Sequence, residues 1–201
     1  MMRGGPARRA APGAAAYRTL VLPGLVVLVA LVALTLAQSG AARAELLEVR
    51  QVAAGMECPE CARALQLRVK ALPGIDAADT SWNRRVLTAH LRRGNQITLE
   101  QIRALVVAQH FQVREAEIVV AGRLEQAAPA GPLLLRVPET GIRYRIDLGA
   151  LTESARRLWH PRLLAAVGAD VVLTARVPGG PDGGDPQLLW PLDLAIGTTG
   201  R

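Results

Sequence analysis

The order of strand-like and helix-like patterns between residues 46 and 118 constrains the fold more than any other feature of this chain. Segments whose apolar residues alternate predict strands, and segments with apolar residues at helical spacing predict helices. In chain order these are a strand at Leu46–Val52, a helix from Cys61 that ends before Pro73, strands at Ile75–Trp82 and Val86–Leu91, a helix that begins after Thr98, and a strand at Phe111–Ile118. This order predicts an α+β fold, the ferredoxin-like βαββαβ sandwich.

The only two cysteines among the 201 residues, Cys58 and Cys61, stand where the first strand leads into the first helix. A turn that opens a helix can direct both sulfur atoms toward one point, and the positive end of the helix dipole favours the thiolate form. Two thiolates suit a soft metal ion such as Cu(I) or Zn(II). Because the same spacing occurs in redox enzymes and in half of many zinc sites, the spacing alone leaves these chemistries open.

Three short segments of this region, one of which contains the two cysteines, resemble motifs that occur in the same order in a known family. Residues 55–61 read Gly-Met-Glu-Cys-Pro-Glu-Cys, residues 71–75 read Ala-Leu-Pro-Gly-Ile, and residues 109–113 read Gln-His-Phe-Gln-Val. They resemble the G-M-x-C-x-x-C, L-x-G-V and A-G-Y-x-V segments of the heavy-metal-associated (HMA) domain family, to which copper chaperones and the periplasmic mercuric-ion binding protein belong. The resemblance covers residues 46–118. It departs from the family at His110, where Gly is usual, and at Phe111, where Tyr is common.

The resemblance implies that Cys58 and Cys61 are metal ligands and that the ion is Cu(I), with Hg(II) or Zn(II) as alternatives. Domains of this kind transfer or sequester their ion, so we expect a metal-donor or metal-acceptor protein as partner and no enzymatic activity. Two other functions are open. The cysteines could serve an extracytoplasmic thiol-disulfide oxidoreductase, or they could form a structural disulfide in a non-catalytic assembly module, since an oxidising compartment favours disulfides.

Other side chains that could bind a metal have simpler interpretations. Met56 is expected to pack in the core beneath the cysteine loop. His110 is expected to be an exposed residue at a helix end, where the dipole favours it, rather than a third ligand. His90 and His160 are expected to be surface or packing residues. Four residues of the C-terminal half could line a groove but are better explained as core: Tyr144, Trp159, Leu189 and Trp190.

The uncharged run Leu20–Ala37 is close to the ~20 residues that span a bilayer. A basic tail, residues 1–18, precedes it, so the positive-inside rule places the N-terminus in the cytoplasm and all later residues outside. We therefore expect a transmembrane anchor over residues 19–38, a linker over residues 39–45, and a single-pass protein of the cell membrane. The alternative is a signal peptide cleaved at Ala44, which would yield a secreted or periplasmic protein.

The charge of the chain does not indicate nucleic-acid binding. The net charge is +7, but the first 44 residues contain five arginines and no acidic residue, which leaves 19 basic against 17 acidic residues in the remainder. Aromatic residues make up only 3% of the chain and offer few platforms for stacking bases. Nucleic acid is therefore not an expected partner.

Residues 119–201 have a different order of predicted strands and helices from the cysteine-containing region 46–118. Strand-like segments occur at Ile118–Leu124, Leu133–Val137, Tyr144–Leu148, Val171–Val177 and Leu188–Leu194, with a helix-like segment at Thr152–Val167. Five strands with a helix between the third and the fourth is the order of an OB-like barrel. We expect a second, small mostly-β domain, for which an OB-like barrel is one candidate. No catalytic Ser/His/Asp set or phosphate-binding loop stands out, so the sequence does not predict the purpose of this domain.

Overall fold

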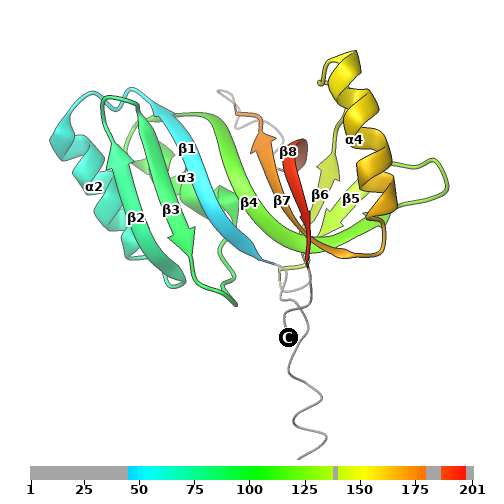
Figure 1. The fold of residues 1–201 in the computed structure, drawn as a ribbon. Coiled ribbons are helices and arrows are strands. Elements are labelled where there is room, and N and C mark those ends of the chain that lie inside the picture. Colours follow the sequence, from blue (N-terminus) through cyan, green and yellow to red (C-terminus); the bar gives the residue numbers. More distant parts are fainter. Residues whose placement is uncertain (1–44, 138–139, 180–186, 198–201) are drawn as a thin grey trace, which may run out of the picture. The chain divides into compact units, whose positions relative to one another are not determined.

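The computed structural model describes residues 45–137, 140–179 and 187–197, all within one compact unit, Ala42–Arg201 (Figure 1). In chain order its elements are β1 (Leu46–Ala54), α2 (Pro59–Lys70), β2 (Ile75–Ser81), β3 (Val86–Leu91), α3 (Leu99–Ala108), β4 (Gln112–Gln126), β5 (Leu133–Arg136), β6 (Arg143–Ile146), α4 (Glu153–Ala165), β7 (Asp170–Val177) and β8 (Leu188–Ile196). The described part of the chain is therefore mostly β, with eight strands and three helices.

The N-terminal half contains strands β2, β3, β1 and β4, which pair in that order, with α2 and α3 on one face of them (Figure 1). Helix α2 begins at the N-cap Cys58 with Pro59 in its first turn. Helix α3 begins at Thr98, which forms a capping box with Gln101. The apolar residues that the two helices bury are Ala62, Leu65, Val69, Leu99, Ile102 and Val106. This burial holds the helices on the sheet.

The C-terminal half is a closed five-stranded barrel that shares strand β4 with the N-terminal half. Its strands follow the order β4-β5-β6-β8-β7, and the pairing of β4 with β7 closes the circle. Helix α4 connects β6 to β7. Trp159 and Leu163 of α4 are buried against the barrel core, which also contains Tyr144 and Leu189. Tyr144, Trp159 and Leu189 therefore pack as core residues, as expected. Trp190 does not: it is half-buried and lines a surface pocket with Val52 and Pro178.

The expected fold class is wrong for the described residues. The helices and strands predicted between residues 46 and 118 are present, but they do not form a ferredoxin-like sandwich that is followed by a separate small β domain. Strand β4 runs without a break from Gln112 to Gln126, so its first part pairs with β1 and its last part with β5. One eight-stranded sheet results, and part of it closes into the barrel.

The continuity of β4 has a physical reason that pattern reading did not reveal. The sequence predicted one strand that ends at Ile118 and another that starts there, yet the two form a single strand in which Val120, Ala121, Gly122 and Leu124 are all buried. Gly122 lies within this strand, at a point where the backbone of β5 approaches closely. A Cβ atom at Gly122 would lie 2.8 Å from the carbonyl oxygen of Arg136, so only glycine fits this position without a shift of the backbone.

The expected transmembrane or signal helix is not found in the described part of the chain. Among these residues no helix has both the length and the apolar character that crossing a membrane requires. The run Leu20–Ala37, the basic tail and most of the linker lie outside the described residues.

Candidate metal centre

The two cysteines lie at the N-terminus of α2, as the sequence predicts. Cys58 is the N-cap residue, with an extended backbone at φ −128° and ψ 144°. The backbone amide of Cys61 donates a hydrogen bond to Cys58 Sγ at 3.0 Å. The first turn of a helix has free amide groups and a positive dipole end, so this position stabilises negative charge on Cys58 Sγ. It is therefore suited to a thiolate.

Cys58 and Cys61 are joined by a disulfide bond, and their Cα atoms are 5.2 Å apart. Both residues are half-buried, and the residues between them, Pro59 and Glu60, are exposed. A disulfide sulfur is not a thiolate, so a metal ion could bind this pair only after reduction. The structure thus places the two sulfur atoms together and shows them in the oxidised state.

Met56 packs in the core, as expected from its position beneath the loop. Its side chain is fully buried and belongs to the same apolar cluster as Leu65. The preceding residue, Gly55, has φ +89°, a conformation that glycine adopts without strain. The turn at Gly55 directs Met56 inward just before the chain reaches Cys58.

His110 has a backbone role at the end of α3. Its φ is +62°, its amide donates to Val107 O at 2.8 Å, and the Phe111 amide donates to Val106 O at 3.1 Å. These two bonds form a Schellman motif, whose left-handed position is usually glycine. The His110 side chain is exposed, and no cluster of three or more metal-binding side chains occurs among the described residues. The structure therefore does not assemble His110 and the cysteines into a three-ligand site.

The other two histidines also lie apart from any such cluster in the described ranges. His90, on β3, is exposed and its Nδ1 lies 3.5 Å from Glu48 Oε2. His160, on α4, lines a surface pocket together with Leu133 and Leu164. Both positions agree with the expectation of surface or packing residues.

Sequence reasoning missed a buried polar network inside the cysteine-containing half. Arg103 of α3 is only 6% exposed, its Nε donates to Gln51 Oε1 at 3.0 Å, and its Nη2 donates to Pro178 O at 2.9 Å. Gln51 Nε2 in turn donates to Arg114 O at 2.9 Å, where the pairing of β1 with β4 shifts register. Burial lowers the pKa of Arg103 from its usual value. The sequence signal that could have revealed this network is an arginine next to the apolar residues of the second predicted helix, on the side expected to face the sheet.

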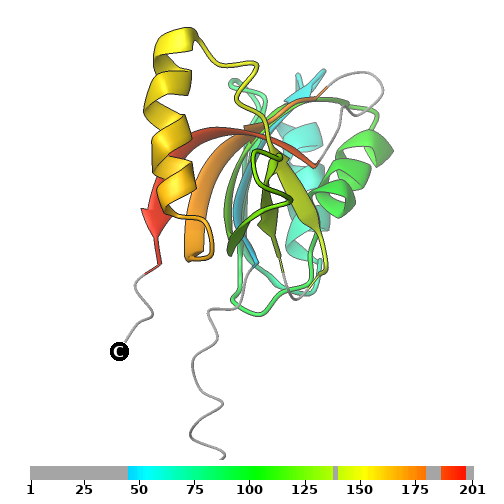
Figure 2. The same ribbon diagram turned by 90° about the vertical axis from the view of Figure 1, so that its right-hand side faces the viewer.

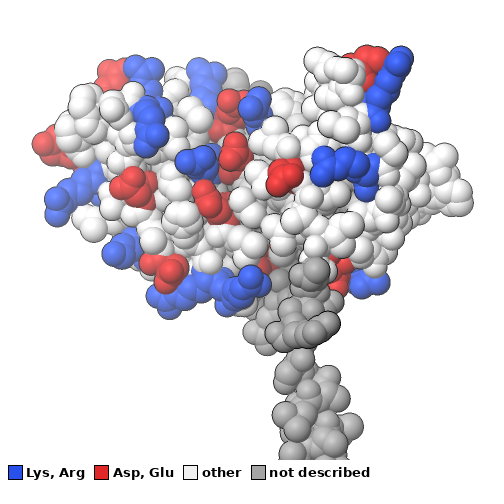
Figure 3. Space-filling model, viewed as in Figure 1, with Lys and Arg blue, Asp and Glu red and all other residues white. Residues whose placement is uncertain are grey.

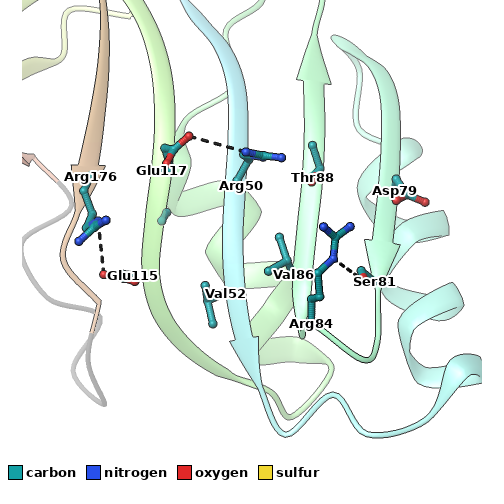
Figure 4. Close-up of a pocket in the computed structure, with 11 residues that line it drawn as sticks. Arg50, Val52, Asp79, Ser81, Arg84, Val86, Thr88, Glu115, Glu117 and Arg176 are labelled. Carbon is teal, nitrogen blue, oxygen red and sulfur yellow. Dashed lines mark hydrogen bonds and ion pairs between the residues drawn. The ribbon is translucent and has the colours of Figure 1, made fainter. Parts of the chain in front are cut away.

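The face of the sheet that α2 and α3 leave uncovered has a pocket of about 270 Å³ (Figure 4). The residues that line it include Arg50, Val52, Glu115, Glu117 and Arg176. Four of its charged groups form two ion pairs: Arg50 Nη1 lies 3.8 Å from Glu117 Oε1, and Arg176 Nε lies 3.6 Å from Glu115 Oε2. Acidic and basic side chains are interleaved over this face (Figure 3). This pattern is typical of a solvated sheet surface, so the cysteine pair remains the better candidate site.

Comparison with known proteins adds one weak likeness. No protein-family profile matches the chain, and no curated protein matches it. A solved structure described as the "solution structure of the yeast copper transporter domain CCC2A in the apo and Cu(I) load states" is 21% identical, and the match covers 33% of this chain and 90% of that one. The TM-score is 0.31, which is too low to carry an argument about fold or function.

Proposed function

We propose that the reduced protein binds a soft metal ion, Cu(I) in preference to others, through Cys58 and Cys61, and that it transfers or sequesters this ion. The proposal depends on one observation above all. The two sulfur atoms converge at the first turn of α2, where the Cys61 amide donates to Cys58 Sγ. The only cysteines of the chain thus meet where a thiolate is stabilised.

Metal binding requires that the disulfide be opened first. A dithiol reductant would supply two electrons and two protons, become a disulfide itself, and leave Cys58 and Cys61 as two thiols. Each thiol then loses its proton when the ion binds, because the thiolate is the ligand. Oxidation and metal binding therefore exclude each other.

The donor set favours Cu(I) over the other candidates. Two sulfur ligands suit soft ions that accept low coordination numbers, which include Cu(I) and Hg(II). Structural Zn(II) sites usually have four protein ligands, and the described residues offer only Cys58 and Cys61 at this point. Mg(II) and Ca(II) prefer oxygen ligands. We infer a carrier rather than an enzyme, because such an ion can leave by ligand exchange with thiolates of a partner.

The test is a titration of the purified full-length protein with Cu(I) against a chromophoric chelator, under reducing and oxidising conditions. We expect one Cu(I) per chain after reduction, and none in the oxidised protein or in the Cys58→Ser/Cys61→Ser variant. His110→Ala is the matched control, and its affinity should stay within about tenfold, or ~1.4 kcal/mol, of the parent. Retention of the stoichiometry by the double serine variant would place the site elsewhere.

The observed disulfide favours a second candidate, thiol-disulfide exchange. A half-buried disulfide at a helix N-terminus can be attacked by an external thiolate. This alternative predicts turnover in an insulin-reduction assay that depends on Cys58. We expect no turnover above that of a small dithiol at equal concentration, and robust turnover would exclude the carrier proposal.

We also propose that the folded residues lie outside the cytoplasmic membrane. The support is the sequence alone: the uncharged run Leu20–Ala37 follows an arginine-bearing tail and precedes every helix and strand of the described residues. A reporter that is active only outside the cytoplasm, fused after Arg201, should be active. Activity of a cytoplasmic reporter at the same position would contradict this location.

A further inference from the structure

The barrel carries three arginines directly opposite one another on adjacent strands. Arg123 of β4 is opposite Arg136 of β5, which is opposite Arg143 of β6. Strands β5 and β6 are the yellow-green strands near the front of Figure 2. The sequence neighbours Leu124, Leu135 and Tyr144 are buried in the barrel, so these three arginines point outward. They are called the arginine row below.

The next outward positions on the same strands extend this basic surface. Glu125 is opposite Leu134, and Leu134 is opposite Arg145. Leu134 is half-buried, whereas Arg145 is exposed. Four of these six outward positions are therefore arginine, and a leucine lies among them.

The stability of the barrel does not explain the arginine row. Like charges directly opposite each other destabilise a sheet. Asp170 Oδ1 lies 3.5 Å from Arg123 Nη1, and Glu125 Oε1 lies 2.9 Å from Arg136 Nε, so these two arginines are partly neutralised. Within the described ranges, the exposed Arg143 has no hydrogen-bond or ion-pair partner. The row thus retains positive charge that the fold itself does not use.

We propose that the arginine row and Leu134 form a docking surface for an extended acidic segment of another protein. A guanidinium group can bind a carboxylate through two parallel hydrogen bonds. The row crosses three strands, a span of roughly 10 Å between backbones, and an extended peptide presents side chains to one side about every 7 Å. Two or three carboxylates of one short segment could therefore reach the row together, with an apolar side chain of the segment on Leu134.

The composition of the surface favours a peptide over other anionic partners. Tyr144 is buried, and none of the six outward residues is aromatic, so no platform exists there for stacking bases. Glu125 and Asp170 flank the row and would repel a continuous phosphate surface, such as a nucleic-acid backbone or anionic lipid headgroups. A peptide can place its carboxylates between these two acids. The proposal is independent of metal binding, since Cys58 and Cys61 take no part in it.

The test measures binding of a fluorescein-labelled peptide, Glu-Ser-Leu-Ser-Glu-Ser-Glu, to the purified full-length protein by fluorescence anisotropy. In an extended peptide of this sequence the glutamate and leucine side chains share one face. We expect binding at low salt that weakens as salt rises, because exposed charges are screened. Arg143→Glu should weaken binding by about tenfold or more, and Arg143→Gln by less. Arg68→Glu, on the exposed surface of α2, makes the same charge change and should have less than about a twofold effect.

Arg143 is exposed and unpartnered in the described residues, so its variants should fold, which circular dichroism can verify. Equal losses for Arg143→Glu and Arg68→Glu would overturn the proposal, because binding would then follow net charge alone. Absence of binding at low salt would also overturn it. So would tighter binding of a single-stranded oligonucleotide or of vesicles with anionic lipid.

Discussion

Two outward rows of the same sheet differ in how they arrange charge. In the first, which we call the alternating row, Arg50 of β1 is opposite Glu117 of β4, and Glu117 is opposite Arg176 of β7. In the arginine row, three positive side chains lie opposite one another in the same way on β4, β5 and β6. Arg50 pairs with Glu117, and Arg176 pairs with the neighbouring Glu115, so the alternating row needs no partner. The arginine row leaves charge for a partner to neutralise, which is why we place the docking surface on the barrel.

The largest predicted effect tests whether the two halves that carry these rows unfold separately. Leu87 of β3 and Leu135 of β5 are both fully buried, so replacing either by Ala should lower the free energy of unfolding by about 2–5 kcal/mol. Because β4 belongs to both halves, each variant should shift one common transition. In a Trp82→Phe background the remaining tryptophans, Trp159 and Trp190, both lie in the barrel half. Denaturant unfolding followed there by circular dichroism and by tryptophan fluorescence should give coincident curves. Two separated transitions for Leu87→Ala would show that the halves are independent.

A smaller loss should follow removal of the network that ties the halves together. Arg103 joins α3 of the N-terminal half to Pro178, which follows the barrel strand β7. Arg103→Met keeps the length of the side chain but leaves Gln51 Oε1 and Pro178 O without this donor. We expect the free energy of unfolding to fall by about 1–3 kcal/mol. Arg63→Met, at an exposed position of α2, is the control and should change it by less than ~0.5 kcal/mol. An equal effect of both substitutions would argue against a role for the network.

Substitutions at the C-terminal ends of α3 and α4 should change the melting temperature in opposite directions. Helix α3 is followed by His110 at φ +62°, and α4 is followed by Gly168 at φ +86°, where no atom would crowd an added Cβ. Side chains other than glycine are strained in this region, by roughly 1 kcal/mol. His110→Gly should therefore raise the melting temperature, and Gly168→Ala should lower it. The same sign for both changes, measured by thermal unfolding, would refute this reading of the two turns.

The smallest predicted effect compares the two charge rows directly. Arg50→Gln removes an attraction to Glu117, and Arg143→Gln removes a repulsion from Arg136. Cross-strand pairs contribute roughly 0.2–1 kcal/mol. The free energy of unfolding at low salt should fall for Arg50→Gln and should rise for Arg143→Gln, and high salt should shrink both differences. A loss of stability for Arg143→Gln would mean that the arginine row stabilises the barrel after all.

The sequence by itself determined the features whose causes are local. Thr98 predicts where α3 begins, and Pro73-Gly74 predicts that α2 ends before Pro73. The position of Cys58 and Cys61 at the opening of a helix was also readable, because a helix start depends on a few neighbouring residues. The main part of the candidate site was therefore predictable from sequence. Its oxidised state and half-buried setting were not, because they depend on packing around the loop.

Tertiary structure alone decided the features that depend on contacts between distant residues. The continuation of β4 into a barrel required β5 and β7 as partners, and no local signal near Ile118 reveals them. The arginine row exists only because strand register brings Arg123, Arg136 and Arg143 opposite one another. From the sequence Arg103 would be interpreted as a surface residue, and only the structure shows its contacts with Gln51 and Pro178. Register and burial arise from long-range pairing, and a one-residue slip would turn every side chain to the other face of its strand.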